Sequence, residues 1–128
     1  MLVAAFGRWH ESHAAARDAL RAGPPVLIAP VAVETFSVLT RLPPPHRAPP
    51  RLVLDFLDAH FEDPPVALAG LRVRELLDEA DASGIVGGAV YDALIAVTSR
   101  EAGGALVSLD QRAARVYRAL GVEHTLLA

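Results

Sequence analysis

The sequence lacks cysteine and lysine altogether and contains few aromatic residues. Without cysteine among its 128 residues, the chain has no thiol catalysis, no cysteine-based metal site and no disulfide scaffold. All twelve of its cationic side chains are arginine, which excludes Schiff-base chemistry and a phosphate loop built on lysine. Aromatic residues make up 5% of the chain and hydrophobic residues 52%, so the core must be built from Ala, Val and Leu.

Charge and hydrophobic runs narrow the class of protein further. The net charge of −3 is not that of a broadly basic nucleic-acid-binding protein, so any contact with phosphate must be local or bridged by a metal ion. No apolar run approaches the ~20 residues needed to cross a bilayer. Residues 1–6 lack the cationic start and the long apolar core of a signal peptide. We therefore expect a cytoplasmic protein whose residues 1–128 form a single domain.

Proline and glycine divide the chain into short segments. The helical spacing of apolar residues predicts helices over residues 11–22, 30–41, 51–61, 71–82, 89–101 and 111–120. Short apolar runs predict strands over residues 26–28, 66–68, 105–109 and 122–127. The proline-rich residues 42–50 predict a stiff loop. Strands that alternate with helices predict an α/β fold, a three-layer α/β/α arrangement around a short parallel sheet.

Three acidic residues are predicted to lie at one edge of this sheet. Ligands of such folds bind beyond the carboxyl ends of the strands, where the covering helices begin. Glu34 and Asp92 lie near the starts of two predicted helices, and Asp110 directly follows a predicted strand. We therefore expect the three carboxylates to lie close together.

The sequence around these acids favours a metal site. Neither Glu34 nor Asp92 has a basic residue three or four positions away, whereas Glu75 has Arg72 at that helical contact spacing. A carboxylate in apolar sequence is costly unless it is hydrogen-bonded, paired, protonated or bound to metal. A divalent cation would offset this cost, and hard oxygen ligands select Mg²⁺ or Mn²⁺.

Each acid also has a simpler explanation. Asp110 on its own is more typical of a helix cap, and the helix dipole favours an acid at the position of Glu34. Asp92 is harder to explain in this way, because its segment is otherwise apolar. Together the three acids favour a shared metal site, whereas the pair His10 and His13 fits a solvated helix start better than a metal site. Nucleophile-elbow, dinucleotide and phosphate-loop motifs are all missing, so we expect no nucleotide cofactor.

At these residues the sequence resembles the PIN-domain ribonucleases, and among them the VapC-type toxins. The matching stretches are residues 9–15, 30–41, 88–96 and 106–110. The resemblance implies a parallel α/β sheet and a cluster of acids that holds Mg²⁺ or Mn²⁺, with Glu34, Asp92 and Asp110 as metal ligands and catalytic residues. It also implies an RNA substrate, a cognate antitoxin protein as partner, and a homodimer or a toxin–antitoxin hetero-oligomer.

The activity that the resemblance implies is endonucleolytic hydrolysis of RNA phosphodiesters by metal-activated water. An acidic cleft is compatible with a basic antitoxin segment that covers it. Arg112, just past Asp110, and Arg41 are candidates for contacts with RNA phosphates. A role as an ordinary surface cation explains either arginine better.

The sequence departs from the family at its start. The family begins with a strand that ends in Asp, just ahead of residues like Ala4, Ala5 and Phe6, but here Met1 falls inside that motif. Either the start codon is placed too late and the natural protein carries the missing strand and acid, or the chain is short and its metal site is weakened. We favour the first, because loss of a central strand would expose two sheet edges. Whether residues 1–3 begin a helix stays open.

Two other functions are compatible with the sequence. The missing acid favours a catalytically impaired PIN-like module that binds an antitoxin without cutting RNA. A phosphatase-like or receiver-like α/β domain also gathers acids at the carboxyl edge of its sheet. The lack of lysine and of paired Asp residues near the start argues against a receiver.

Overall fold

A computed structural model describes residues 1–127, which divide into two compact units. The N-terminal unit comprises residues 1–65 together with Leu127, and the C-terminal unit comprises Val66–Leu126. Within the described residues, no helix has the length and apolar character needed to cross a membrane.

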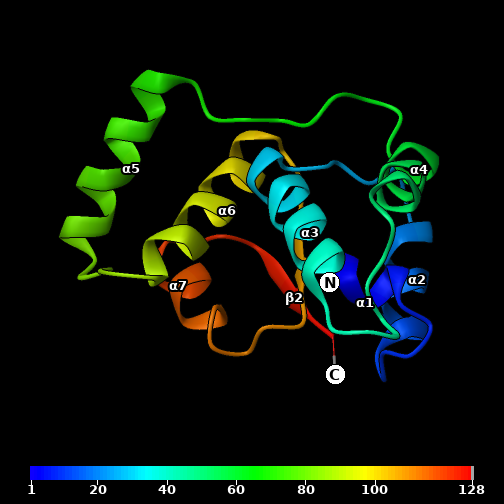
Figure 1. Cartoon of the computed structure of the whole chain (residues 1–128). Coiled ribbons are helices and arrows are strands. Elements are labelled where there is room, and N and C mark those ends of the chain that lie inside the picture. Colours follow the sequence, from blue (N-terminus) through cyan, green and yellow to red (C-terminus); the bar gives the residue numbers. More distant parts are fainter. Residues whose placement is uncertain (128) are drawn as a thin grey trace. The chain divides into compact units, whose positions relative to one another are not determined.

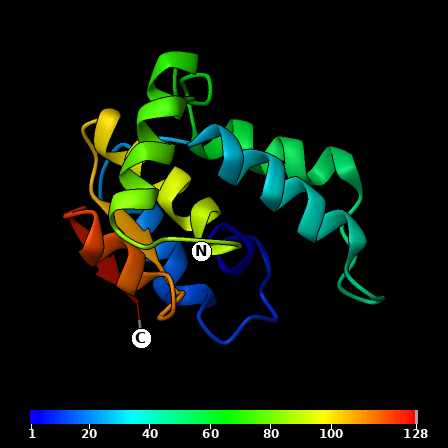
Figure 2. The same ribbon diagram turned by 90° about the vertical axis from the view of Figure 1, so that its left-hand side faces the viewer.

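The N-terminal unit is built from helices (Figure 1). Their bounds are α1 Leu2–Phe6, α2 His13–Arg21, α3 Ala29–Arg41 and α4 Pro50–His60. Helix α1 contacts α2 and α3, and α3 packs along α4, as Figure 2 shows. Leu39 of α3 and Val53 of α4 are fully buried in the core between these two helices, together with Ala48 of the connecting loop.

The proline-rich connection between α3 and α4 is tied to the end of α3. The backbone N–H of Ala48 donates a hydrogen bond to the carbonyl oxygen of Leu39 at 2.9 Å. Helix α4 begins at Pro50, one residue inside the predicted loop, because proline is tolerated in the first turn, where its missing N–H would have no helical partner.

Residues 2–6 form helix α1, which settles the conformation that the sequence left open. Leu2, Ala4 and Ala5 are buried. The turn into α2 uses both closely spaced histidines: His10 Nδ1 accepts a hydrogen bond from the N–H of Ser12 at 3.0 Å, and His13 Nδ1 donates one to the carbonyl oxygen of Ala4 at 2.8 Å. These two histidines therefore stabilise the local structure through their Nδ1 atoms. The expectation that they are not a metal pair stays a prediction.

The C-terminal unit combines helices with a small parallel sheet (Figure 1). Its elements are α5 Gly70–Ala82, α6 Ala89–Glu101, β1 Leu106–Ser108, α7 Ala114–Ala119 and β2 His124–Leu126. Strands β1 and β2 are parallel, with Leu106 opposite His124 and Ser108 opposite Leu126. Helix α6 packs against α5 and α7. Its Ala93 and Ala96 are fully buried in the main core of this unit.

The predicted helices are confirmed, and the fold is α/β with a small parallel sheet, as expected. Helix α6 has the predicted bounds, whereas α7 is shorter than predicted because residues 111–113 form a turn ahead of it. Strands β1 and β2 lie inside the runs predicted for them and are shorter.

The strands predicted over residues 26–28 and 66–68 are wrong. In these runs only Ile28 and Val66 form isolated bridges. Pro25 and Pro65 come directly before the two runs, and Pro30 follows the first of them closely. Proline has no N–H to donate to a ladder, so extended pairing cannot continue through these positions.

Candidate active site

Asp110 lies two residues beyond the end of β1, at the carboxyl edge where the sequence predicts it. Its Oδ1 accepts hydrogen bonds from the backbone N–H groups of Arg112 at 2.9 Å and Ala113 at 3.3 Å. The N–H of Asp110 in turn donates to Oγ of Ser108 at 3.0 Å. The carboxylate therefore closes an Asx-type turn over residues 110–113. It is not the cap of the helix, as the sequence suggested for it, because α7 begins at Ala114 and its N-cap position is Ala113, which makes no side-chain cap hydrogen bond.

The turn uses only one oxygen of this carboxylate. Within residues 1–127, Oδ2 of Asp110 accepts no hydrogen bond, and the residue is exposed. Oδ1 thus holds the backbone, and Oδ2 is available to a ligand. The structural role and the role of a metal ligand are not exclusive alternatives for Asp110, because each requires a different oxygen.

Asp92 and Asp110 line the same pocket. Asp92 lies in the first turn of α6 and is half-buried, next to the fully buried Ala93. The pocket has a volume of about 560 Å³, and its walls come from the α5–α6 connection, the start of α6 and the segment from Asp110 into α7. Gly84 in that connection has a φ of 68°, a conformation that residues with a Cβ rarely adopt. Two acids that are 18 positions apart in the sequence (110 − 92) therefore meet at one hollow.

Two arginines share this pocket with the acids. Arg112, predicted as a candidate RNA contact, is one of them, and Arg115, which the sequence reasoning missed, is the other. The available signal was their spacing: Arg112 and Arg115 follow Asp110 at two and five positions, so a short turn into a helix can present both on one side.

Glu34 and Arg41 lie on α3, in the N-terminal unit, and both side chains are exposed. The apolar sequence around Glu34 does not bury it, because α3 buries a different face, which carries Thr35 and Leu39. The argument that an apolar environment makes this carboxylate costly is therefore wrong for Glu34. Its role as a metal ligand stays a prediction that depends on the family resemblance.

The donor chemistry of the pocket fits a hard divalent cation in part. Across residues 1–127, no group of three or more His, Cys, Asp or Glu side chains is placed to hold a metal ion. Asp92 and Asp110 nevertheless offer carboxylate oxygens at one pocket. Mg²⁺ commonly binds through one or two carboxylates and keeps several waters, so this pair suits it better than it suits an ion that needs a full protein cage.

The family model for the PIN domain matches residues 1–119. The chain belongs to the PIN-domain family. This PIN domain is 46% identical over 127 residues to Ribonuclease VapC40 of Mycobacterium tuberculosis, in strains CDC 1551 / Oshkosh and ATCC 25618 / H37Rv; the alignment covers 99% of this chain and 94% of that protein. It is 37% identical over 122 residues to Ribonuclease VapC27 of strain ATCC 25618 / H37Rv, covering 94% of this chain and 87% of the relative. No solved structure matches it.

These similarities confirm the resemblance drawn from the sequence. The chain is a VapC-type PIN-domain protein, and its helices and small parallel sheet are consistent with that fold. The relatives carry the name ribonuclease, which supports a nuclease of this family.

Proposed function

We propose that this PIN domain is a Mg²⁺- or Mn²⁺-dependent endoribonuclease and the toxin of a type II toxin–antitoxin pair. The observation that carries the proposal is the pocket of the C-terminal unit, where Asp92 and Asp110 arrive from different elements. The similarity to two proteins named ribonuclease, over almost the whole chain, supports RNA as the substrate.

In this proposal Asp92 and Asp110 are metal ligands and Glu34 contributes a third carboxylate. When bound, the divalent cation supplies polarisation of the scissile phosphate and a water molecule of lowered pKa. The hydrogen bonds from the backbone N–H groups of Arg112 and Ala113 orient the Asp110 carboxylate before substrate arrives. Arg41 and Arg112 contact RNA phosphates.

We further propose the extent of the functional domain, the partners of the protein and its place of action in the cell. Because the family match runs through residues of both units, we take residues 1–128 as one functional domain. Its partners are RNA and a cognate antitoxin protein, in a homodimer or a toxin–antitoxin hetero-oligomer. Its place of action is the cytoplasm, where the cellular RNA is found.

The test is Mn²⁺-dependent cleavage of total RNA by the parent chain and by matched variants. Asp92→Asn and Asp110→Asn remove a negative charge while keeping the shape of the side chain, and Asp18→Asn does the same at an exposed position of α2. We expect the first two variants to lose about 100-fold or more in rate, equal to about 2.7 kcal/mol of transition-state stabilisation. Glu34→Gln tests the third proposed ligand in the same assay.

Cleavage by the parent and by Asp18→Asn, with loss in Asp92→Asn, supports the metal nuclease. Equal cleavage by the parent and Asp92→Asn would place the activity elsewhere and contradict the assignment. A folded parent that cuts no RNA but still binds an antitoxin would replace the enzyme with the binding module.

A further inference from the structure

Two negatively charged and two positively charged side chains line the pocket. The acids are Asp92 and Asp110, and the bases are Arg112 and Arg115. Every other lining residue is uncharged. A site that only binds a cation has no use for two guanidinium groups, because they repel the metal.

Neither arginine of the pocket is held by an acidic partner. Within residues 1–127, Arg112 and Arg115 form no ion pair, although two carboxylates line the same hollow. Both are exposed. Their guanidinium groups therefore retain all their hydrogen-bonding capacity for a ligand.

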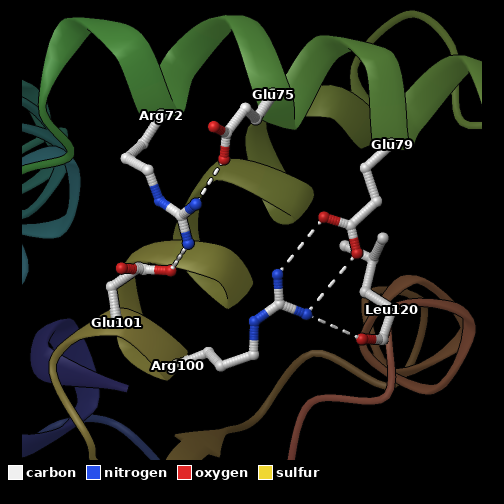
Figure 3. Close-up of polar contacts among 6 residues, drawn as sticks. All are labelled: Arg72, Glu75, Glu79, Arg100, Glu101 and Leu120. Carbon is white, nitrogen blue, oxygen red and sulfur yellow. Dashed lines mark hydrogen bonds and ion pairs between the residues drawn. The ribbon is translucent and has the colours of Figure 1, made fainter.

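Arginines with a structural role in the same unit look different (Figure 3). Arg72 of α5 pairs with Glu75 on its own helix and with Glu101 of α6, and the contact with Glu101 raises the pKa of Arg72. Arg100 of α6 pairs with Glu79 at 3.2 Å and donates a hydrogen bond to the carbonyl oxygen of Leu120 at 3.0 Å (Figure 3). Where this unit uses arginine to join its helices, the guanidinium group is bound to acceptors, whereas in the described part of the chain no ion pair is formed by Arg112 or Arg115.

The backbone that carries the pocket arginines is anchored. Ala113 and Ala114, between the two arginines, are 1% exposed, and Val116 is also buried. The N–H of Arg112 is hydrogen-bonded to the Asp110 carboxylate at 2.9 Å. This segment therefore fixes the backbone of both arginines, which limits the backbone entropy lost when they bind a ligand.

We propose that Arg112 and Arg115 together bind phosphate groups of single-stranded RNA next to the bond that is cut, with Arg115 as a substrate-binding residue. This inference rests on the proposed function. A guanidinium group presents a planar fork of donors that matches phosphate oxygens. In a chain of net charge −3, RNA must approach two carboxylates, and a local pair of cations offsets that repulsion.

The experiment measures RNA binding without cleavage. A labelled single-stranded RNA is titrated with the full chain in EDTA over a series of salt concentrations, using fluorescence anisotropy. Arg115→Gln and Arg112→Gln are compared with Arg118→Gln, an exposed position of α7 outside the pocket lining that also forms no ion pair within residues 1–127. We expect each pocket variant to reduce the slope of log K against log salt by about 0.7, and Arg118→Gln to leave it unchanged.

The conservative variant Arg115→Lys checks that the effect is one of charge at the phosphate. It should retain the salt slope of the parent and bind RNA more weakly, because an ammonium group cannot form the forked contact. Equal slopes for Arg115→Gln and Arg118→Gln, or no measurable RNA binding by the parent, would overturn the inference. So would a loss confined to antitoxin binding, which would assign the two arginines to the partner protein.

The binding experiment tests the phosphate contact, and the cleavage experiment tests the nuclease, so each claim can fail without the other. The binding assay contains no divalent metal and does not depend on catalysis. A parent that cuts no RNA while Arg115→Gln still lowers the salt slope would contradict the nuclease and support the phosphate contact. The reverse result, Asp92-dependent cleavage with an unchanged slope in Arg115→Gln, would overturn the phosphate contact alone.

Discussion

The two oxygens of the Asp110 carboxylate allow its structural and chemical contributions to be separated. Asp110→Asn keeps a side-chain oxygen able to accept hydrogen bonds from the N–H groups of Arg112 and Ala113, because asparagine forms Asx turns as aspartate does. Asp110→Ala removes that oxygen as well as the charge. We expect both variants to lose RNA cleavage, and only Asp110→Ala to lose stability.

The size of the stability loss follows from the surroundings of the two donors. Arg112 is exposed, so its N–H can donate a hydrogen bond to water once the carboxylate is removed. Ala113 is 1% exposed, and the variant removes the hydrogen bond that its N–H donates to Oδ1 at 3.3 Å. The loss of one hydrogen bond at an exposed residue and one at a buried residue gives a cost of about 1 kcal/mol. For a chain of this length, that cost lowers the Tm by about 4 °C.

Thermal and urea unfolding followed by circular dichroism, on the parent and both variants, measures this difference. Asp110→Asn should unfold within a few tenths of a kcal/mol of the parent. If Asp110→Asn were as unstable as Asp110→Ala, the negative charge and not the two hydrogen bonds would hold this turn. If Asp110→Ala were as stable as the parent, the structural role of the carboxylate would be refuted.

Two further predictions concern side-chain packing. Leu39→Ala should lower the free energy of unfolding by about 2–5 kcal/mol, because Leu39 is 0% exposed. Leu71 of α5 is 76% exposed, so Leu71→Ala should lower it by less than about 0.5 kcal/mol. Similar losses for the two variants in urea unfolding would contradict the assigned core. Gly7→Ala should destabilise the chain by about 1–3 kcal/mol, because the added Cβ would lie 2.6 Å from Cε2 of Trp9. The loss should be smaller in a variant that also carries Trp9→Ala. An equal loss in that double variant would show that the strain does not come from Trp9.

Most of the helices were predictable because their signals are local. Helix α6 has the predicted bounds, and α3 ends at the predicted residue because the prolines that follow Arg41 cannot continue a helix. The position of Asp110 just past β1 was predictable for the same reason: a short apolar run followed by an aspartate is typical of a strand that ends in a turn.

The short strands were less predictable, because a strand exists only where a partner pairs with it. The apolar runs over residues 26–28 and 66–68 are similar in sequence to the run that forms β1, yet they form only isolated bridges, at Ile28 and Val66. Hydrophobicity was the wrong guide there, and the prolines directly before both runs were the better one.

The sequence by itself determined the existence of helices α2 to α7, the chemistry that the chain cannot perform, and the placement of Asp92 at the start of a helix and of Asp110 after a strand. Only the tertiary structure decided that these two acids share a pocket, that Arg115 joins Arg112 there, and that Glu34 is exposed in spite of its apolar neighbours. The physical reason is the range of the interactions. Helix propensity, capping and proline geometry act within about four residues along the chain, so a sequence can be read for them. Burial and pocket formation depend on which distant elements pack together, as α6 and α7 do around Asp92 and Asp110.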